Sequence, residues 1–267
     1  MAQDKQTLLV ALLQMDITIG EPEVNFLRLE KMLHEAVIEE VRPDVIVIPE
    51  MWNTGYALDR IHELADDDGV RTKQFLSDFA KEHKVNIIGG SIADKREERI
   101  YNTIYAFDRQ GQCMAEYSKI HLFRLMDEEK YLHSGDALGR FELEGVPAGA
   151  MICYDIRFPE LSRKLALEGA QILFVPAEWP HPRLHHWRTL LMARAIENQM
   201  YVVSCNRVGT SGTTSFFGHS MIINPWGEVI VEGDETESIL FGEIELTEVE
   251  KVRKTIPIFE DRRPHLY

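Results

Sequence analysis

The chain has 267 residues, of which 45% are hydrophobic and 27% charged, and its formal net charge is −15. This length suits one large domain or two small ones, and the composition is typical of a soluble globular protein. The acidic balance, without a basic cluster, argues against partners such as nucleic acid or anionic membranes, and no apolar run approaches the roughly 18 residues of a membrane span.

The N-terminal segment and the cysteines predict a cytoplasmic protein. Residues 7–13 are apolar but short, and no basic leader or small-residue cleavage site accompanies them, which indicates a first strand rather than a signal peptide. The three cysteines, Cys113, Cys153 and Cys205, form neither a CxxC pair nor a disulfide framework. We therefore expect free thiols in a reducing cytoplasm.

Apolar, β-branched runs predict buried strands along most of the chain. They cover residues 8–15, 45–48, 85–92, 100–107, 148–153, 172–175, 201–204, 221–223 and 239–244. Helical periodicity appears at 26–37, 70–84, 161–167 and 186–198. Residues 85–119 read as consecutive strands, so the mixture predicts a layered α/β protein with mixed sheets. With no repeat or linker, residues 1–267 are expected to form one domain, with the polar stretch 252–267 as an extended tail.

The first segment with chemical potential is the run 45–50, VIVIPE, which predicts a buried strand ending in a carboxylate. Proline ends the strand, so Glu50 is expected at its carboxyl end, the edge where open α/β sheets bind ligands. A glutamate among apolar residues has a raised pKa and can act as a general base. The alternative is a helix-capping or surface glutamate.

The second segment, residues 117–123, places Lys119 after a strand and before an apolar turn. A lysine among apolar neighbours is costly unless an acid pairs with it. Such a lysine can stabilise an oxyanion or lower the pKa of a thiol. The alternative is a lysine whose ammonium group reaches the surface.

The third segment places Cys153 at the end of the strand 148–153, and residues 154–158 form the turn before a helix. A tight turn of this kind exposes the side chain and leaves backbone N–H groups free to bind an oxyanion. Thiolate is an intrinsically strong nucleophile. The alternative is a small core residue, which is our interpretation of Cys113 and Cys205 because they lack the turn.

The three segments together resemble the signature blocks of the nitrilase, or carbon–nitrogen hydrolase, superfamily. The blocks are Pro49-Glu50, SKIHLF at 118–123 and CYDIRFPE at 153–160, in the same order and at similar spacing. The similarity runs from about Leu8 to the tail and includes Asn102-Thr103, residues 193–199 and residues 224–227. Three long blocks in register are far more specific than any one of them.

The resemblance implies a Glu–Lys–Cys triad. Glu50 would be the general base, Lys119 would stabilise the tetrahedral intermediate, and Cys153 would be the nucleophile. A second glutamate would position the lysine and the substrate amide, and the spacing favours Glu128, with Glu129 as the alternative. The implied fold is a four-layer αββα sandwich that commonly pairs into an αββα–αββα homodimer, and the chemistry requires no metal or organic cofactor.

Within the superfamily, Tyr154 after the cysteine and Arg157-Phe158-Pro159-Glu160 resemble the ω-amidases and their bacterial relatives. That branch acts on 2-oxoglutaramate and 2-oxosuccinamate. N-carbamoyl hydrolases remain the main rival, whereas nitrile hydrolysis is less favoured because nitrilases more often have Trp-Glu after the cysteine. The backbone N–H of Tyr154 would help to hold the oxyanion.

Residues 177–187, AEWPHPRLHHW, are expected to form a wall of the substrate pocket because they follow a strand. Trp179 could pack against the acyl chain and Arg183 could meet a substrate carboxylate, and the alternative for both is a surface loop. Arg157 is expected to be structural, paired with a nearby acid. The histidines of this stretch lack an acid or cysteine that would complete a metal site, and residues 210–218 are expected to form a mobile loop.

Two other classes remain as alternatives. A non-catalytic interaction protein would use the acidic surface or the tail, but it would have no need of Glu50, Lys119 and Cys153 together. A cysteine hydrolase of the isochorismatase type would pair Cys153 with an N-terminal aspartate such as Asp16, which leaves the Pro49-Glu50 block unexplained.

Overall fold

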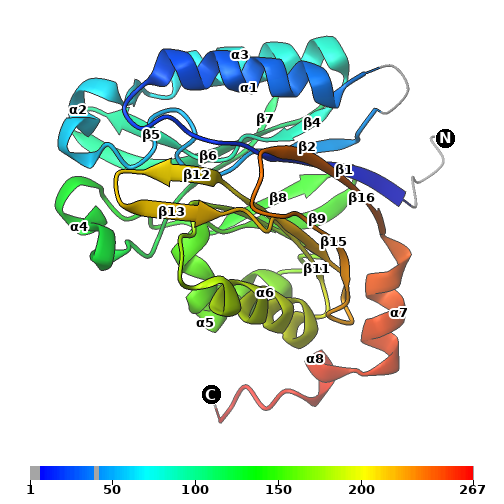
Figure 1. The fold of residues 1–267 in the computed structure, drawn as a ribbon. Coiled ribbons are helices and arrows are strands. Elements are labelled where there is room, and N and C mark those ends of the chain that lie inside the picture. The colour runs from blue at the N-terminus through cyan, green and yellow to red at the C-terminus, as the bar shows by residue number, and fades with distance from the viewer. Residues whose placement is uncertain (1–6, 39–41, 267) are drawn as a thin grey trace.

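The computed structural model describes residues 7–38 and 42–266, which form two β-sheets packed face to face between two layers of helices (Figure 1). The larger sheet has the order β16-β1-β2-β4-β6-β5-β3, with β7 also pairing with β6, and the second sheet has the order β15-β14-β11-β10-β9-β8. Helices α1 and α3 cover the larger sheet, and α5 and α6 cover the second one. This arrangement is the predicted αββα sandwich.

The strands of the larger sheet are β1 (Thr7–Gln14), β2 (Val45–Val47), β3 (Asp66–Asp67), β4 (Asn86–Ile88), β5 (Ile92–Arg96), β6 (Arg99–Phe107), β7 (Cys113–Ser118) and β16 (Ser238–Glu245). Those of the second sheet are β8 (Gly139–Leu143), β9 (Val146–Ala150), β10 (Ile172–Ala177), β11 (Tyr201–Asn206), β14 (Met221–Ile223) and β15 (Val229–Glu232). A separate hairpin pairs β12 (Val208–Ser211) with β13 (Thr214–Phe217).

The helices are α1 (Pro22–Ala36), α2 (Ile61–Leu64), α3 (Val70–His83), α4 (Glu128–Tyr131), α5 (Pro159–Leu167), α6 (Leu184–Asn198), α7 (Thr247–Thr255) and α8 (Ile258–Asp261). Shorter 3-10 helices span Leu58–Arg60, Arg124–Met126 and Cys153–Arg157. No helix in the described part of the chain is both long and apolar enough to cross a membrane.

Strand β1 shows why its sequence is apolar throughout. Its residues Leu8, Val10 and Leu12 pack into the core between the two sheets, whereas Ala11 and Leu13 pack under the helices. Successive side chains of a strand point to opposite faces, so a strand covered on both faces reads as a continuous apolar run rather than an alternating one.

The predicted strand at 85–92 is divided in two. The chain turns between β4 and β5 at Gly89 and Gly90, and Gly90 has φ = +58°, a conformation that favours glycine. A Cβ atom at Gly90 would lie 2.1 Å from the carbonyl oxygen of Pro49. The turn therefore packs directly against Pro49, the residue before Glu50.

Two further expectations differ from the structure. Residues 252–267 were expected to be extended, but α7 continues to Thr255 and α8 follows, with Val249 and Val252 buried on one side of α7. Residues 210–218 were expected to form a mobile loop, but most of them belong to the hairpin β12–β13, where Phe216 and Phe217 are buried. In both segments, a few buried apolar side chains hold an otherwise polar stretch of the chain against the core. The turn at residues 224–227 connects β14 to β15.

Candidate active site

Glu50 lies fully buried just beyond the carboxyl end of β2, and four donors surround its carboxylate. Its Oε1 accepts hydrogen bonds from Lys119 Nζ at 2.8 Å, Tyr56 Oη at 2.6 Å and Asn102 Nδ2 at 2.8 Å. Its Oε2 accepts a hydrogen bond from the backbone N–H of Glu178 at 2.7 Å. The carboxylate is therefore held in one orientation by donors from β6, from the residues that directly follow β7 and β10, and from a loop.

These donors reverse the expected pKa shift of Glu50. Burial by itself pushes the pKa of the carboxyl group up, but the Lys119 ammonium and the hydrogen bonds from Lys119, Tyr56 and the Glu178 amide hold it below its usual value. The prediction of a raised pKa was wrong because it counted the apolar neighbours of Glu50 and not the cation. Glu50 is consequently ionised, and able to accept a proton, over the neutral pH range.

Lys119 lies directly after β7 and is also fully buried. Its Nζ contacts two carboxylates, Glu50 Oε1 at 2.8 Å and Glu128 Oε1 at 2.7 Å, and its backbone N–H donates to the Asn102 carbonyl at 2.8 Å. Burial opposes the charged form of the lysine, but the two carboxylates raise its pKa well above the ordinary value. Lys119 therefore remains a cation inside the protein.

Glu128 opens the short helix α4, and it is the second glutamate that contacts the lysine. Its Oε1 accepts hydrogen bonds from Lys119 and Tyr56, and its Oε2 accepts one from the backbone N–H of Phe123 at 2.7 Å. Glu129, the alternative that the sequence left open, is exposed. Burial and the nearby Glu50 raise the pKa of Glu128, although Lys119 opposes this shift.

Cys153 lies at a sharp corner between the second sheet and α5. Strand β9 ends at Ala150, so the cysteine follows the strand by three residues and begins a 3-10 helix. Its φ is +44°, a conformation that costs a non-glycine residue of order 1–3 kcal/mol. Such strain persists only where the surroundings enforce it.

Asp155 is the residue that ties this corner down. Its Oδ2 accepts hydrogen bonds from the Ile152 backbone N–H at 3.0 Å and Tyr117 Oη at 2.6 Å, and its Oδ1 contacts the backbone N–H and Nδ1 of His121. Tyr117 and His121 flank Lys119 in the sequence. Asp155 therefore fixes the cysteine corner to the lysine segment, a role that the sequence analysis did not identify.

Cys153 is 7% exposed, and its thiol lies within the electrostatic influence of Glu50 and Lys119. Burial and the charge of Glu50 raise the pKa of the thiol well above its ordinary value, and the attraction of Lys119 does not offset them. The possibility that Lys119 lowers this pKa overall is therefore wrong. The resting arrangement is a neutral thiol beside an ionised carboxylate, which can remove the proton as sulfur attacks.

Known proteins are similar to this chain in sequence and in fold. The sequence profile of the family described as carbon-nitrogen hydrolase matches residues 9–254. The chain belongs to the carbon–nitrogen hydrolase family. The 2-oxoglutaramate amidase of Bacillus subtilis (strain 168) is 48% identical over 258 residues, which cover 97% of this chain and 98% of that protein. Omega-amidase NIT2 of Homo sapiens is 32% identical over 269 residues, which cover 97% and 96%.

A solved structure supports the same assignment. The carbon-nitrogen hydrolase from Helicobacter pylori G27 superposes with a TM-score of 0.93 at 25% identity, and the match covers 99% of this chain and 98% of that one. The αββα sandwich described above is thus the architecture of a known carbon–nitrogen hydrolase.

In this carbon–nitrogen hydrolase, Cys153 lies on the wall of a small pocket. It contains all three residues predicted to bind substrate. The lining residues besides Cys153 are Tyr56, Phe123, Met126, Tyr154, Arg157, Glu178, Trp179, Pro180 and Arg183.

Two arginines lie on the wall of this pocket. The Arg157 guanidinium lies over the Trp179 ring, 4.6 Å from its centroid, and the Arg183 guanidinium lies 5.7 Å from the centroid of Phe123. Arg157 was expected to pair with an acid, but its contacts are the rings of Trp179 and Tyr154 and a 3.4 Å approach to His186 Nδ1. Burial lowers the pKa of Arg157 from its usual value. Both cations are thus available to an anionic ligand.

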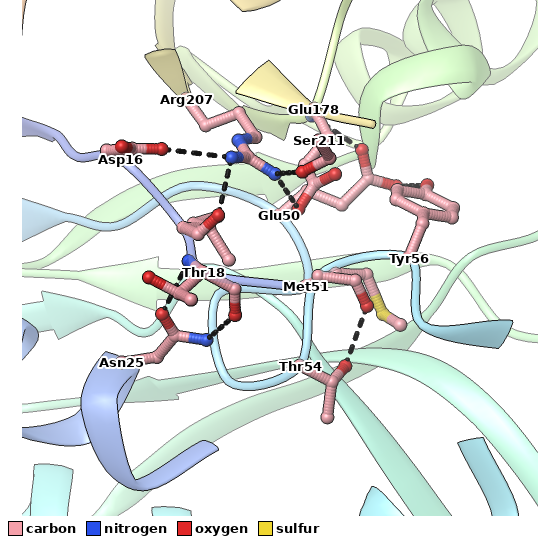
Figure 2. A network of polar contacts seen from close by, with 12 residues as sticks. Asp16, Thr18, Asn25, Glu50, Met51, Thr54, Tyr56, Glu178, Arg207 and Ser211 are labelled. Atoms are coloured by element: carbon pink, nitrogen blue, oxygen red, sulfur yellow. Dashed lines mark hydrogen bonds and ion pairs between the residues drawn. The ribbon is translucent and has the colours of Figure 1, made fainter. Parts of the chain in front are cut away.

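Sequence reasoning missed three residues of this site: Tyr56, Asn102 as a hydrogen-bond donor, and Glu178. Figure 2 shows Glu178 with Arg207 on one side and Glu50 and Tyr56 on the other. Asn102 lies in one of the segments that resemble the family, and this resemblance was the one sequence signal for a role of Asn102 in the site. Tyr56 and Glu178 reach Glu50 only through the fold.

Proposed function

We propose that the protein is a thiol-dependent amidase of the ω-amidase type, which hydrolyses a small carboxylate-bearing amide such as 2-oxoglutaramate or 2-oxosuccinamate to the acid and ammonia. The observation that carries the proposal is the position of Cys153 on the wall of a pocket lined by two arginines, with the charge of Glu50 close enough to raise the pKa of its thiol. Relatives named 2-oxoglutaramate amidase and Omega-amidase support the choice of substrate.

In the acylation half-reaction, Glu50 takes the thiol proton while the sulfur of Cys153 bonds to the amide carbon. The negative charge moves to the former carbonyl oxygen, where Lys119 and the backbone N–H of Tyr154 stabilise it. Glu50 then gives its proton to the amide nitrogen, the carbon–nitrogen bond breaks, and ammonia leaves. A thioester on Cys153 remains.

In the deacylation half-reaction, Glu50 removes a proton from a water molecule, which attacks the thioester carbon. The second tetrahedral intermediate collapses, the carbon–sulfur bond breaks, and the proton held by Glu50 returns to the thiolate. The product acid leaves, and the neutral thiol beside an ionised Glu50 is restored.

Glu128 supports both half-reactions through Lys119. The ammonium lies between Glu50 and Glu128, so its position and its charge are fixed before substrate binds. Preorganised charge of this kind requires no rearrangement as the oxyanion develops. The Tyr56 hydroxyl lies within hydrogen-bonding distance of both carboxylates, and its single hydrogen is shared between them.

The part of the substrate that carries its carboxylate is proposed to bind along the wall of the pocket. Trp179 offers a flat apolar face to the short acyl chain, and Tyr154 closes the same side. Arg183 meets the carboxylate, and Arg157, held over Trp179, adds a second positive charge.

Three further expectations belong to this proposal: a single domain over residues 1–267, a cytoplasmic location and a homodimer or larger homo-oligomer. The three cysteines are free thiols, as a reducing compartment would leave them. Ile196 and Trp226 are exposed apolar side chains at the position where α6 meets the β14–β15 turn, which suits a contact with a second copy. The molar mass in solution, measured by light scattering, tests the homo-oligomer.

The test of the function is ammonia release by the wild-type protein and Cys153→Ala over one panel of substrates. The panel contains 2-oxoglutaramate, 2-oxosuccinamate, glutamine, an N-carbamoyl amino acid and a simple nitrile. We expect turnover of the two oxo-amides that depends on Cys153, with an unchanged circular dichroism spectrum in the variant. Turnover confined to the carbamoyl compound or the nitrile would overturn the substrate, and full activity in the variant would overturn the mechanism.

A further inference from the structure

Glu178 is a pocket residue with an unusual set of contacts. It follows β10 directly, its side chain is buried, and it lines the pocket beside Cys153. Its backbone N–H serves Glu50, but its carboxyl group takes no part in the chemistry derived above. Within the described ranges, its Oε2 is buried and has no hydrogen-bond partner.

The neighbouring cation does not satisfy this carboxyl group. Arg207 Nη1 approaches Glu178 Oε1 at 3.5 Å, a long contact for a charged pair. The same guanidinium makes closer contacts elsewhere, to Asp16 Oδ1 at 3.1 Å and the Ile17 carbonyl at 2.6 Å (Figure 2). Asp16 thus already balances the charge of Arg207, and Glu178 receives only a weak hydrogen bond.

The charged groups around Glu178 favour its neutral form. Burial raises the pKa of Glu178 to about 8 against the attraction of Arg207, and the nearby Glu50 charge adds to the rise. Lys119 opposes it weakly from behind Glu50. The remaining titratable groups that share the pocket are Tyr56, Cys153, Tyr154, Arg157 and Arg183.

The position of the proton follows from the geometry. Oε1 faces a guanidinium N–H, which is a donor, so in the neutral acid Oε1 is the carbonyl oxygen and Oε2 carries the hydrogen. A buried O–H group without an acceptor is costly. Its natural acceptor is an atom that arrives with a ligand.

We propose that Glu178 is a substrate-binding residue that acts as a neutral acid, and that its Oε2–H donates a hydrogen bond to an oxygen in the carboxylate-bearing part of the amide. Lys119 and the Tyr154 N–H already serve the oxygen under attack, which leaves this donor for the rest of the substrate. The inference rests on the proposed function, because it assumes an anionic amide. Loss of the proton from Glu178 would place a negative charge beside an anionic substrate and remove the donor.

The first experiment is the pH dependence of KM for the oxo-amide that the protein turns over best. We expect KM of the wild type to rise as the pH passes about 8, whereas a neutral aliphatic amide of the same length shows no such rise. Glu178→Gln keeps a donor at this position and cannot ionise, so its KM is expected to stay flat. The exposed Glu129→Gln is the matched control and should follow the wild type. The same alkaline rise in Glu178→Gln and in wild type would overturn the proposal.

An infrared titration provides a test that does not depend on turnover. The wild type at neutral pH should show the C=O stretch of a buried protonated carboxyl group, and this band should disappear as the pH passes about 8 and shift when the amide binds to Cys153→Ala. A band that stays in place on binding, or no band at all, contradicts the proposal. Failure of the proposed function instead leaves the band present while Cys153→Ala binds no member of the panel.

Discussion

Two buried cysteines of the second sheet show how little of the reactivity of a thiol depends on its own acidity. Cys205 lies inside β11 and donates to the Leu13 carbonyl at 3.3 Å, and Cys153 lies at the corner after β9. Burial raises the pKa of both thiols. Acidity therefore does not separate them.

The difference lies in what surrounds each sulfur atom. Cys153 has the charged pair Glu50 and Lys119 close enough to shift the pKa of its thiol, and it lines a pocket. Cys205 has a carbonyl oxygen and apolar neighbours. Under the proposed mechanism, Cys153 acts as the nucleophile because a base is placed to take its proton at the moment of attack, and not because a thiolate is stored in advance.

The largest effect is expected from removing that base. Glu50→Gln keeps an acceptor for Lys119 and Tyr56 but cannot take the thiol proton, so Cys153 should become as inert as Cys205. We expect kcat to fall by about 10³-fold, within the range of general base catalysis. Steady-state ammonia release measures this loss, with Glu129→Gln as the control. A fall of less than about tenfold would show that another group accepts the proton.

Alkylation compares the two cysteines within one molecule. We expect iodoacetamide to modify Cys153 about 100-fold faster than Cys205, with loss of activity in proportion to Cys153 modification. Because burial and Glu50 raise the pKa of the Cys153 thiol, its rate should continue to increase beyond pH 9, the ordinary pKa of a thiol. Mass spectrometry of tryptic peptides measures each rate. A rate for Cys153 that levels off near neutral pH would indicate a preformed thiolate and contradict the comparison.

A smaller effect is expected from Tyr56→Phe, which leaves the base and the cation in place and loosens both. The variant loses hydrogen bonds from the phenol to Glu50 and Glu128. Hydrogen bonds to charged groups contribute about 1.5–3 kcal/mol, and 1.4 kcal/mol is a factor of ten, so kcat/KM should fall about tenfold or somewhat more. Tyr117→Phe is the comparison variant: it loses a hydrogen bond to Asp155 at the cysteine corner and leaves the contacts of Glu50 and Glu128 unchanged. Wild-type kcat/KM in Tyr56→Phe would show that Lys119 alone positions the two glutamates.

The same comparison explains how far the sequence could predict this site. Glu50 and Cys153 stand at the ends of apolar runs and Lys119 stands at the end of the consecutive strands predicted over residues 85–119, so the strand pattern places all three at strand ends, and the three blocks resemble one family. Their mutual distances and the sign of the Glu50 shift could not be predicted in this way, since both depend on a lysine 69 residues away. Local sequence indicates burial, but it does not indicate which charge shares the buried space.

Sequence analysis missed the roles of Glu178 and Asp155 for the same reason: their partners lie far away in the sequence. Glu178 meets Glu50 across 128 residues of sequence, and Asp155 reaches His121 across 34. In α7, only Val249 and Val252 are buried, and the rest of the segment is mostly charged, so its low hydrophobicity concealed the helix. The apolar pattern of the sequence predicted the elements that bury many apolar side chains. It did not predict polar segments that only two or three buried side chains attach to the core.

The smallest effect is expected at Cys205, where the comparison predicts a structural role only. Cys205→Ala removes a buried sulfur and its contact with the Leu13 carbonyl, so the free energy of unfolding should fall by about 1–2 kcal/mol. Urea denaturation measures this change, and the exposed Cys113→Ala should stay within about 0.5 kcal/mol of the wild type. Both variants should keep kcat and KM, because neither sulfur lies in the pocket or contacts Glu50. A tenfold loss of kcat in Cys205→Ala with unchanged stability would mean that β11 transmits strain to the cysteine corner, and the two thiols would no longer be independent.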